Sequence, residues 1–371
     1  MAYYGIDIHS DSVTCAMIKN DRRQHDIKIF SFSLFGKGFG RFLKGLTKEE
    51  VILIEATTLS FWFYDQVKDK VRACYVLNSN KLTVKGNKTD DIDATRLVKI
   101  LTYNELMITD PAELPYIYIP TEEVRELRGM FTTYSLNKKI LTQSMNRIHS
   151  IFKQNGMKID RKLLSSKKFR EEKLSHYILP SMWMVQVVSL VNTMDVLEIE
   201  KKQLKDLICY KGYKLFSKEI TKLISIKGFS PLTATALMAD IATINRFSSS
   251  KNFCSYLRTA PRVTASNTTV HLGRTNKQGR SLTCTLLTQS VNHLSSAGVH
   301  FTEFKERIKK GKRPCTVRMA LIRKIFVSAY HMLKRDQLFH WVDEKSYERK
   351  LSELHRVIKK YEKNEMALKA S

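Results

Sequence analysis

The first third of the chain alternates short apolar runs with polar turns. Residues 2–35 hold three such runs separated by only a few polar residues, which favours an antiparallel meander of strands. Further along, continuous apolar runs predict two buried strands, and amphipathic stretches predict two helices. These elements are the strands 51–56 and 73–78 and the helices 60–71 and 89–101, the last with Thr89 as N-cap. The resulting order, β-β-β-(α)-β-α-β-α, predicts an α/β domain.

A cluster of prolines separates this region from a largely helical remainder. Three of the seven prolines, Pro111, Pro115 and Pro120, fall within ten positions, which is typical of a domain boundary. Apolar residues then recur every three or four positions over 122–152 and again over 182–208, around a basic run at 160–173. We expect an antiparallel helical hairpin of coiled-coil type, suited to dimerisation and to nucleic-acid binding.

The C-terminal half is also mainly helical in its pattern. Residues 217–241 predict two short helices around a turn at Gly228, residues 245–285 are polar, and the segment 304–333 ends in an amphipathic helix. The tail after Asp343 is charged, and we expect it to form a solvated helix. The predicted parts are therefore 1–118, 119–212, 213–342 and 343–371.

The charge of the chain indicates the kind of partner that it binds. The 371 residues include 63 Lys and Arg against 36 Asp and Glu, a net charge of +27. Residues 1–110 contain 16 basic and 14 acidic residues, so nearly all the excess lies in the remainder. A surface of this charge indicates a polyanionic partner, although charge also serves solubility.

The apolar pattern excludes other classes of protein. The most apolar stretch, Trp183 to Val191, is broken by polar residues and is shorter than the roughly 20 residues of a membrane span. The N-terminus has no secretory pattern. We expect a cytoplasmic protein without a membrane partner, associated with the nucleoid when it is bound to DNA.

The six cysteines predict no metal site. Cys15, Cys74, Cys209, Cys254, Cys284 and Cys315 form no CxxC pair, and no histidine lies at zinc-ligand spacing from them. We interpret them as reduced and mostly buried thiols.

Four carboxylates in the first domain are candidates for catalysis. Asp7 lies inside an apolar strand, Glu55 ends another, and Asp90 and Asp93 share one face of a helix start. An unpaired acid in an apolar strand is costly, whereas several converging carboxylates can hold divalent ions at a phosphodiester. Oxygen ligands favour Mg²⁺, two per site, with Mn²⁺ as an alternative. Taken singly, Asp90 and Asp91 also fit ordinary helix capping.

These motifs resemble a known family. GIDIHSDSVTCAMI, ILIEAT and NKTDDIDATRLVKIL are similar to the RNase H-like (RuvC-like) domain of the DEDD insertion-sequence transposases. That family includes the Piv-type invertases and the bridge-RNA-guided recombinases. The resemblance implies that Asp7, Glu55, Asp90 and Asp93 are the acidic, metal-binding tetrad.

The resemblance continues through residues 223–287 and covers about residues 3–335. It implies a C-terminal transposase domain with a helix-hairpin-helix and a P-x4-S motif that begins at Pro261 and ends at Ser266. In the family this serine attacks DNA and forms a phosphoserine. Asn267 stands where the family pattern has glycine, and Lys227 and Ser230 also depart from it. We expect folding or dimerisation to bring Ser266 to the carboxylates, because no His–Asp pair is evident beside it.

The resemblance also implies nucleic-acid contacts, and guidance by an element-encoded RNA rests on it alone. In the polar loop we expect phosphate clamps, and on the helical hairpin a basic face. The clamps are Arg262, Arg274, Lys277 and Arg280, and the basic face comprises Arg125, Arg128, Arg147, Lys167, Lys168 and Arg170.

The leading interpretation is a Mg²⁺-dependent serine DNA recombinase, a dimer or tetramer that bridges donor and target DNA. A site-specific invertase would share this chemistry and would adjoin an invertible segment. A hydrolytic RuvC-like junction nuclease would remain active without Ser266. An inactive nucleic-acid-binding relic, which Asn267 favours, would be unaffected by the loss of Asp93.

Overall fold

The structure, a computed structural model, describes residues 1–19, 26–78, 89–106, 114–266, 269–295 and 299–370. The chain divides into two compact units, Met1–Pro120 and Thr121–Ser371. The division falls at the last of the three clustered prolines. Each unit is described by itself.

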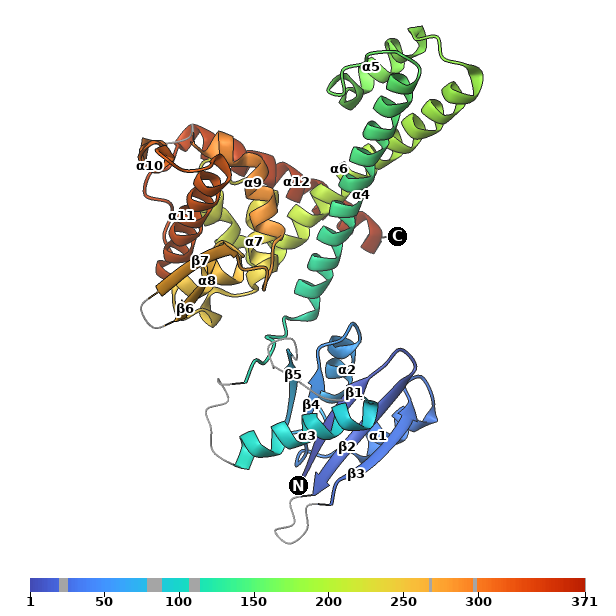
Figure 1. The fold of residues 1–371 in the computed structure, drawn as a ribbon, viewed down its shortest axis with the longest axis vertical. Helices are drawn as coiled ribbons and strands as arrows, with labels where there is room; N and C mark the ends of the chain where they lie inside the picture. Colours follow the sequence, from blue (N-terminus) through green and yellow to red (C-terminus); the bar gives the residue numbers. More distant parts are fainter. Residues whose placement is uncertain (20–25, 79–88, 107–113, 267–268, 296–298, 371) are drawn as a thin grey trace. The chain divides into compact units, whose positions relative to one another are not determined.

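Unit 1 is a five-stranded mixed sheet with the order β3-β2-β1-β4-β5 (Figure 1). The predicted antiparallel meander is confirmed, and β4 and β5 extend the sheet in parallel to β1. The strands are β1 (Ala2–Ile8), β2 (Ser12–Lys19), β3 (Lys28–Ser33), β4 (Val51–Glu55) and β5 (Ala73–Leu77). The helices are α1 (Lys37–Gly45), α2 (Ser60–Val67) and α3 (Asp90–Leu106).

The two faces of this sheet support two separate cores. Side chains alternate between the faces along each strand. One set, including Ile6 and Ile54, packs with Phe39 of α1 and Phe63 of α2. The other set packs against α3 and includes Tyr3 and Leu53, with Ala94, Leu97 and Val98 from the helix. The α3 face is also the face of Asp7, because Asp7 alternates with Ile6.

Gly5 allows α3 to approach β1 closely. A Cβ atom built at Gly5 would lie 2.2 Å from the backbone nitrogen of Val98 and 2.3 Å from the carbonyl oxygen of Ala94. Both atoms belong to the helix backbone, so no side-chain rotation can relieve the clash. Gly5 therefore sets the distance between α3 and the strand that bears Asp7.

We expect Gly5→Ala to displace α3 and to weaken unit 1. Overpacking of a well-packed core costs typically about 1–3 kcal/mol, and a backbone clash falls at the upper end. Thermal unfolding should show a lower Tm, with hydrogen exchange increased first in α3. Gly40→Ala, on α1 with open space around its Cβ position, is the matched control and should leave Tm unchanged or slightly raised. Equal Tm values for the two variants would contradict this role of Gly5.

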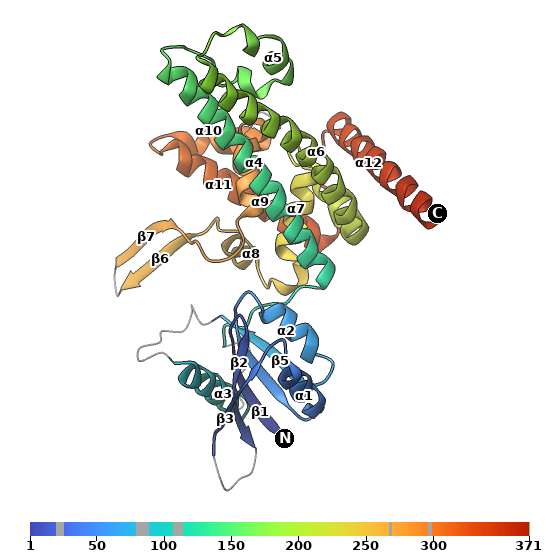
Figure 2. The ribbon, with the colours of Figure 1, turned by 90° about the vertical axis from the view of Figure 1, so that its right-hand side faces the viewer.

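Unit 2 begins with the predicted helical hairpin. The helices α4 (Glu122–Gln154) and α6 (Ser181–Leu223) run side by side, with α5 (Lys167–Glu172) at the far end (Figures 1 and 2). Their contact surface includes Ile148, Val187 and Met194, all fully buried. The helix α6 is longer than predicted and contains an irregular residue, Phe216, with φ −139° and ψ 43°.

The helix α6 bears on the expectation that the protein has no membrane partner, because it is long and apolar. Among the described residues it is the one helix whose length and composition suit a membrane span, with a mean hydropathy of 1.2 over 18 residues. Its inner side packs on α4, whereas several apolar side chains on its outer side are exposed. These two apolar sides explain its hydropathy.

The remainder of unit 2 is built around one large core. The helix α7 (Pro231–Ile241) is buried along its whole length, begins at the N-cap Ser230 and follows a turn in which Gly228 has φ +88°. The two predicted helices around Gly228 are thus present as the end of α6 and α7. The other helices are α8 (Ser250–Tyr256), α9 (Leu282–Ser295), α10 (Val299–Lys309) and α11 (Pro314–Arg335).

A two-stranded antiparallel sheet stands in the region where the sequence predicted only a polar segment. It consists of β6 (Pro261–Ser266) and β7 (Thr269–Thr275). The alternation of apolar and polar residues was too weak to predict these strands, because the hairpin projects from the core and Val263 is exposed (Figure 2).

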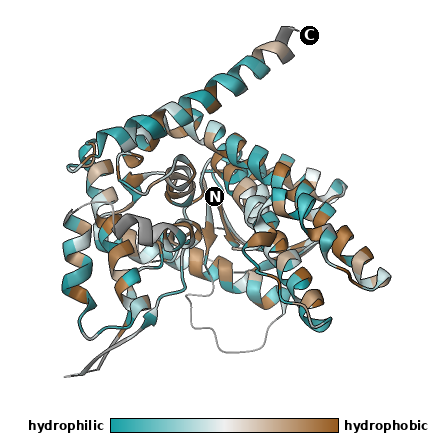
Figure 3. Ribbon diagram, turned by 90° about the horizontal axis from the view of Figure 1, so that it is seen from above, coloured by the Kyte–Doolittle hydropathy of each residue, from teal (hydrophilic) through white to brown (hydrophobic). Residues whose placement is uncertain are grey.

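The C-terminal helix α12 (Glu344–Ala370) differs from the solvated tail that we expected. Its colouring in Figure 3 is largely hydrophilic, yet it packs along α6 and buries Leu354 and Ile358. Lys350 is buried as well: its Nζ donates to the carbonyls of Ile224 and Ile226, and burial lowers its pKa to about 8. The predicted helix is present and most of its residues are exposed, but one apolar stripe suffices to dock it on the rest of unit 2.

Candidate active site

Two of the predicted carboxylates stand at the ends of neighbouring parallel strands. Ile6 of β1 pairs with Ile54 of β4, so Asp7 and Glu55 occupy the next paired position. Paired residues of parallel strands point to the same face, here the face covered by α3. Asp7 is 7% exposed, as the sequence predicted for an acid inside an apolar strand.

The start of α3 brings the other two carboxylates to this strand end. The Thr89 Oγ1 accepts a hydrogen bond from the Ile92 nitrogen at 3.4 Å, which confirms the predicted cap. Asp90 and Asp93 then lie in the first turn, where the helix dipole favours negative charge. Asp93 also accepts a hydrogen bond from Arg96 at 2.9 Å.

His9 joins this group, although the sequence analysis did not single it out. Its Nε2 lies 3.3 Å from an Asp7 carboxylate oxygen and 3.2 Å from one of Asp90. The three donor atoms all lie within 4.8 Å of one another. The feature of the sequence that could have indicated His9 is its place two residues after Asp7, in the turn between β1 and β2. We name Asp7, Glu55, Asp90, Asp93 and His9 the acidic cluster.

The negative charges of the acidic cluster act on one another, as the pKa of Asp7 shows. Burial raises the pKa of Asp7, His9 lowers it, and the negative charges of Glu55, Asp90 and Asp93 raise it further. Asp7 and Asp90 thus meet at His9, whereas Glu55 and Asp93 act on Asp7 through their charge and lie outside this group of three donor atoms.

The donors suit a divalent cation. Carboxylate oxygens of Asp7 on β1 and Asp90 on α3 converge with His9 Nε2, which among the described residues has no well-directed hydrogen-bond partner. Oxygen ligands suit Mg²⁺ and Mn²⁺, and an imidazole nitrogen is a better ligand for Mn²⁺ than for Mg²⁺. The same group can also exist without an ion, so the cluster does not identify a metal.

The predicted nucleophile lies in unit 2. Ser266 is the last residue of β6, and its backbone pairs with Thr269 at the start of β7. Asn267, the predicted departure from the family pattern, lies outside the described residues. Arg262, Arg274 and Lys277 are exposed on or beside this hairpin. Arg280 is half-buried and differs from these three, because its Nε donates to buried Asp240 at 3.0 Å.

The predicted cations of the helical hairpin are of three kinds. Arg147, Lys167 and Lys168 are exposed, and both lysines pair weakly with acids four residues along. Arg125 and Arg128 are half-buried near the base of α4. Arg170 lies outside any exposed basic face, because its side chain is fully buried.

Arg170 serves the fold of the hairpin tip. Its Nη2 donates to Asp195 at 2.6 Å and to Glu198 at 2.8 Å, and its Nη1 donates to the Leu164 carbonyl at 2.8 Å. The helix pattern did not predict that Arg170 is buried, because the two acids that pair with it lie 25 or more residues away on α6.

Part of unit 2 is similar to a known family. Residues 220–307 match the sequence model of the family described as Transposase IS116/IS110/IS902 family. The match runs from the end of α6 through most of α10 and contains Ser266 and the hairpin. No curated protein matches the chain. The match supports an insertion-sequence transposase, a DNA-modifying enzyme for which DNA is a partner.

Proposed function

We propose that this protein is the transposase of an insertion sequence and that it cuts and rejoins DNA through a serine nucleophile. The observation that carries the proposal is that the charges of Glu55, Asp90 and Asp93 all act on Asp7, in a chain whose residues 220–307 match a transposase family. The strand order β3-β2-β1-β4-β5, with α3 on one face, supports an RNase H-like origin of unit 1.

In this proposal the acidic cluster binds Mg²⁺, two ions per site. When bound, such ions stabilise the charge that develops on phosphate oxygens and favour ionisation of a hydroxyl. The part of the protein is to hold Asp7, Glu55, Asp90 and Asp93 in place on two strands and a helix. His9 lies between the carboxylates of Asp7 and Asp90 and contacts both through its Nε2.

Ser266 carries the covalent step. Its Oγ attacks the phosphorus of the scissile phosphodiester and forms a new P–O bond, while the bond from phosphorus to one sugar oxygen breaks. The hydroxyl proton is released to solvent, and the departing sugar oxygen takes up a proton and leaves as a free hydroxyl. The phosphoserine conserves the diester bond, so a second DNA end can attack it and restore serine. This step requires Ser266 and the acidic cluster to act on the same phosphodiester.

The experiment that tests the proposal is a cleavage assay with the DNA that flanks the gene. With Mg²⁺ present, we expect a covalent protein–DNA adduct that survives denaturing electrophoresis and disappears with a chelator. Cleaved DNA without an adduct would instead support a hydrolytic nuclease. Intact DNA under all metal conditions would support a nucleic-acid-binding relic.

An element-encoded guide RNA is the finer part of this proposal. It rests on the family resemblance, and the basic excess outside residues 1–110 with the exposed cations of the hairpin tip supports only a nucleic-acid partner in general. Purification of the protein from its own host, followed by sequencing of bound RNA, tests it. A discrete RNA encoded beside the gene is the expected result, whereas only bulk ribosomal fragments would contradict guidance.

A homodimer or tetramer is also proposed, and the outer side of α6 supports it. Four exposed apolar residues follow one another at spacings typical of a coiled-coil seam. They are Met182 at 75%, Val185 at 64%, Val196 at 60% and Ile199 at 56% exposure. Ser189 and Asn192 continue the spacing of three and four between them. We name these six residues the α6 seam and propose a second copy of the chain as its partner.

We expect Val196→Glu to weaken self-association at least tenfold. The substitution places a charge in each half of a symmetric contact, where burial of one valine contributes about 1.5–3 kcal/mol. Light scattering over a range of concentrations measures the molar mass. Leu136→Glu, an equally charged change at an apolar α4 position that is 53% exposed, is the control. An unchanged molar mass of V196E at every concentration would contradict the seam.

A further inference from the structure

A cavity in unit 2 is lined by three arginines from separate segments. It has a volume of about 430 Å³ and lies between α4, the end of α8 and the start of α9. Arg128 comes from α4, Arg258 follows α8, and Arg280 precedes α9. No acidic residue is among the described residues that line it. The cavity is therefore strongly electropositive.

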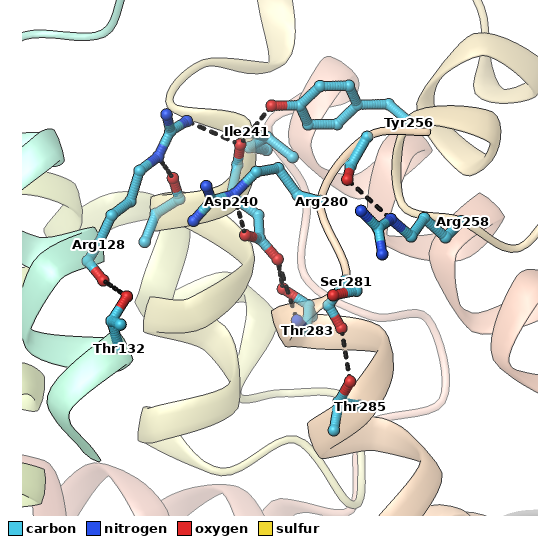
Figure 4. Close-up of polar contacts among 12 residues, drawn as sticks. Arg128, Thr132, Asp240, Ile241, Tyr256, Arg258, Arg280, Ser281, Thr283 and Thr285 are labelled. Atoms are coloured by element: carbon cyan, nitrogen blue, oxygen red, sulfur yellow. Dashed lines mark hydrogen bonds and ion pairs between the residues drawn. The ribbon is translucent and has the colours of Figure 1, made fainter. Parts of the chain in front are cut away.

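Hydrogen bonds to the protein fix all three guanidinium groups (Figure 4). Arg128 donates from Nε to the Ala239 carbonyl at 2.7 Å and from Nη2 to the Asp240 carbonyl at 3.0 Å. Arg258 donates from Nε to the Gly279 carbonyl at 2.7 Å. These bonds hold the side chains in place before any ligand arrives, which lowers the entropy cost of binding.

Buried Asp240 orients Arg280 without neutralising the cavity. One of its oxygens accepts from Arg280 Nε at 3.0 Å, and the other accepts from the nitrogen and hydroxyl of Thr283 at 3.0 and 2.7 Å. Asp240 is completely buried and is shared with the start of α9. The Asp240 carboxylate therefore pairs with one of the three arginines, Arg280, and leaves the cavity with a net positive charge.

The cations also act on one another. Burial lowers the pKa of Arg128, and the charges of Arg280 and Arg246 lower it further, against the opposite effect of Asp240. Excess positive charge in a partly buried cavity is relieved when an anion binds. Ser281 also lines the cavity, and its hydroxyl can donate to such an anion, whereas the hydroxyl of Thr285 donates to the Ser281 carbonyl at 2.8 Å.

The remaining walls combine apolar residues with uncharged polar ones such as Thr132 and Ser135. Phe131 and Leu282 line the cavity beside the arginines. A volume of about 430 Å³ falls within the range of ligand sites, roughly 300–1,000 Å³, and exceeds the needs of one phosphate group alone. A phosphate joined to a less polar group matches this division into a cationic and an uncharged side.

We propose that this cavity binds one nucleotide of a nucleic-acid strand, with its phosphate between Arg128, Arg258 and Arg280. The inference rests on the proposed function for the presence of such a strand, and it adds a built binding site that joins α4 to segments within the match to the transposase family. Arg258 had no predicted role, and Arg128 and Arg280 act here from fixed positions inside the protein rather than as cations of an open surface.

The test places a carboxylate at the rim of the cavity. Thr132→Glu changes an exposed position of α4 that lines the cavity. Thr133→Glu is the matched control, because Thr133 is exposed on the same helix, does not line the cavity and makes the same type of bond to the carbonyl four residues before it. Both variants have the same net charge, and glutamate favours helix more than threonine does.

Fluorescence anisotropy with a labelled single-stranded oligonucleotide measures binding across a salt series. We expect Thr132→Glu to bind about 10- to 100-fold more weakly than Thr133→Glu at low salt, with a salt slope smaller by about one. Equal affinities of the two variants, with the wild type binding, would overturn the inference and leave the proposed function intact. Absence of binding by the wild type would overturn both.

Inorganic phosphate is the second probe, with Tm as its measurement. A rise in Tm for the wild type and Thr133→Glu, but not for Thr132→Glu, supports a phosphate site in this cavity. The same rise together with equal oligonucleotide affinities would identify free phosphate as the ligand and overturn the assignment to a nucleotide.

Discussion

We expect Ser266→Ala to abolish the proposed covalent protein–DNA adduct. We expect a loss of about 10³-fold or more, which is the scale of removing a nucleophile. The physical reason is that the adduct is a bond to the Ser266 Oγ, and alanine has no atom that can replace it. The measurement is the fraction of labelled DNA that remains attached to protein after denaturation.

The control for this prediction lies across the same hairpin. Thr269 pairs with Ser266 through the backbone and is exposed, so Thr269→Ala removes a hydroxyl nearby and leaves the ladder intact. We expect its adduct yield to remain within a few-fold of the wild type. An adduct that persists in S266A, mapped to another residue by peptide sequencing, would refute Ser266 as the nucleophile.

Asp7→Asn is expected to stop strand cleavage and, at the same time, to stabilise the metal-free protein. Asp7 is buried, and three neighbouring acids raise its pKa, so its negative charge is unfavourable without a cation. Asparagine keeps the shape of the side chain and removes the charge. We expect cleavage to fall by about 10²–10³-fold or more, because metal binding and transition-state charge stabilisation both depend on this group.

Two measurements distinguish this role of Asp7 from a merely structural one. Cleavage is measured with saturating Mg²⁺, and Tm is measured in chelator, where D7N should exceed the wild type. Asp91→Asn is the matched control, because Asp91 is exposed in the same first turn of α3 and lies outside the acidic cluster. If D91N lost as much activity as D7N, or if D7N lowered Tm in chelator, the acidic cluster would not be the metal site.

Much of unit 1 followed from local patterns. Strand alternation, the apolar run of β4 and the cap at Thr89 are short-range features, and they predicted the elements and the strand ends that carry Asp7 and Glu55. The place of His9 did not follow, because its contact with Asp90 joins the turn after β1 to a helix that begins about eighty residues later. Gly5 likewise shows its role only when α3 is seen against β1.

In unit 2 the sequence was informative about helices and less so about their surfaces. Periodicity predicted α4, α6 and the turn at Gly228. It did not distinguish the exposed Lys167 from the buried Arg170, because adjacent basic residues of a short helix look alike until Asp195 and Glu198 approach from α6. The same holds for α12, whose charges hid the stripe that docks on α6.

By itself, the sequence determined the order of most elements and the basic excess that indicates a nucleic-acid partner, because these depend on residue type and on local spacing. It also offered four carboxylates as candidates, whereas the proposal of Ser266 as nucleophile rests on the family resemblance. The tertiary structure alone decided that His9 joins the acidic cluster, that Arg170 is buried, and that Arg128, Arg258 and Arg280 share one cavity. Each of these depends on contacts between segments distant in the chain, which burial and charge pairing select only when the whole core is packed.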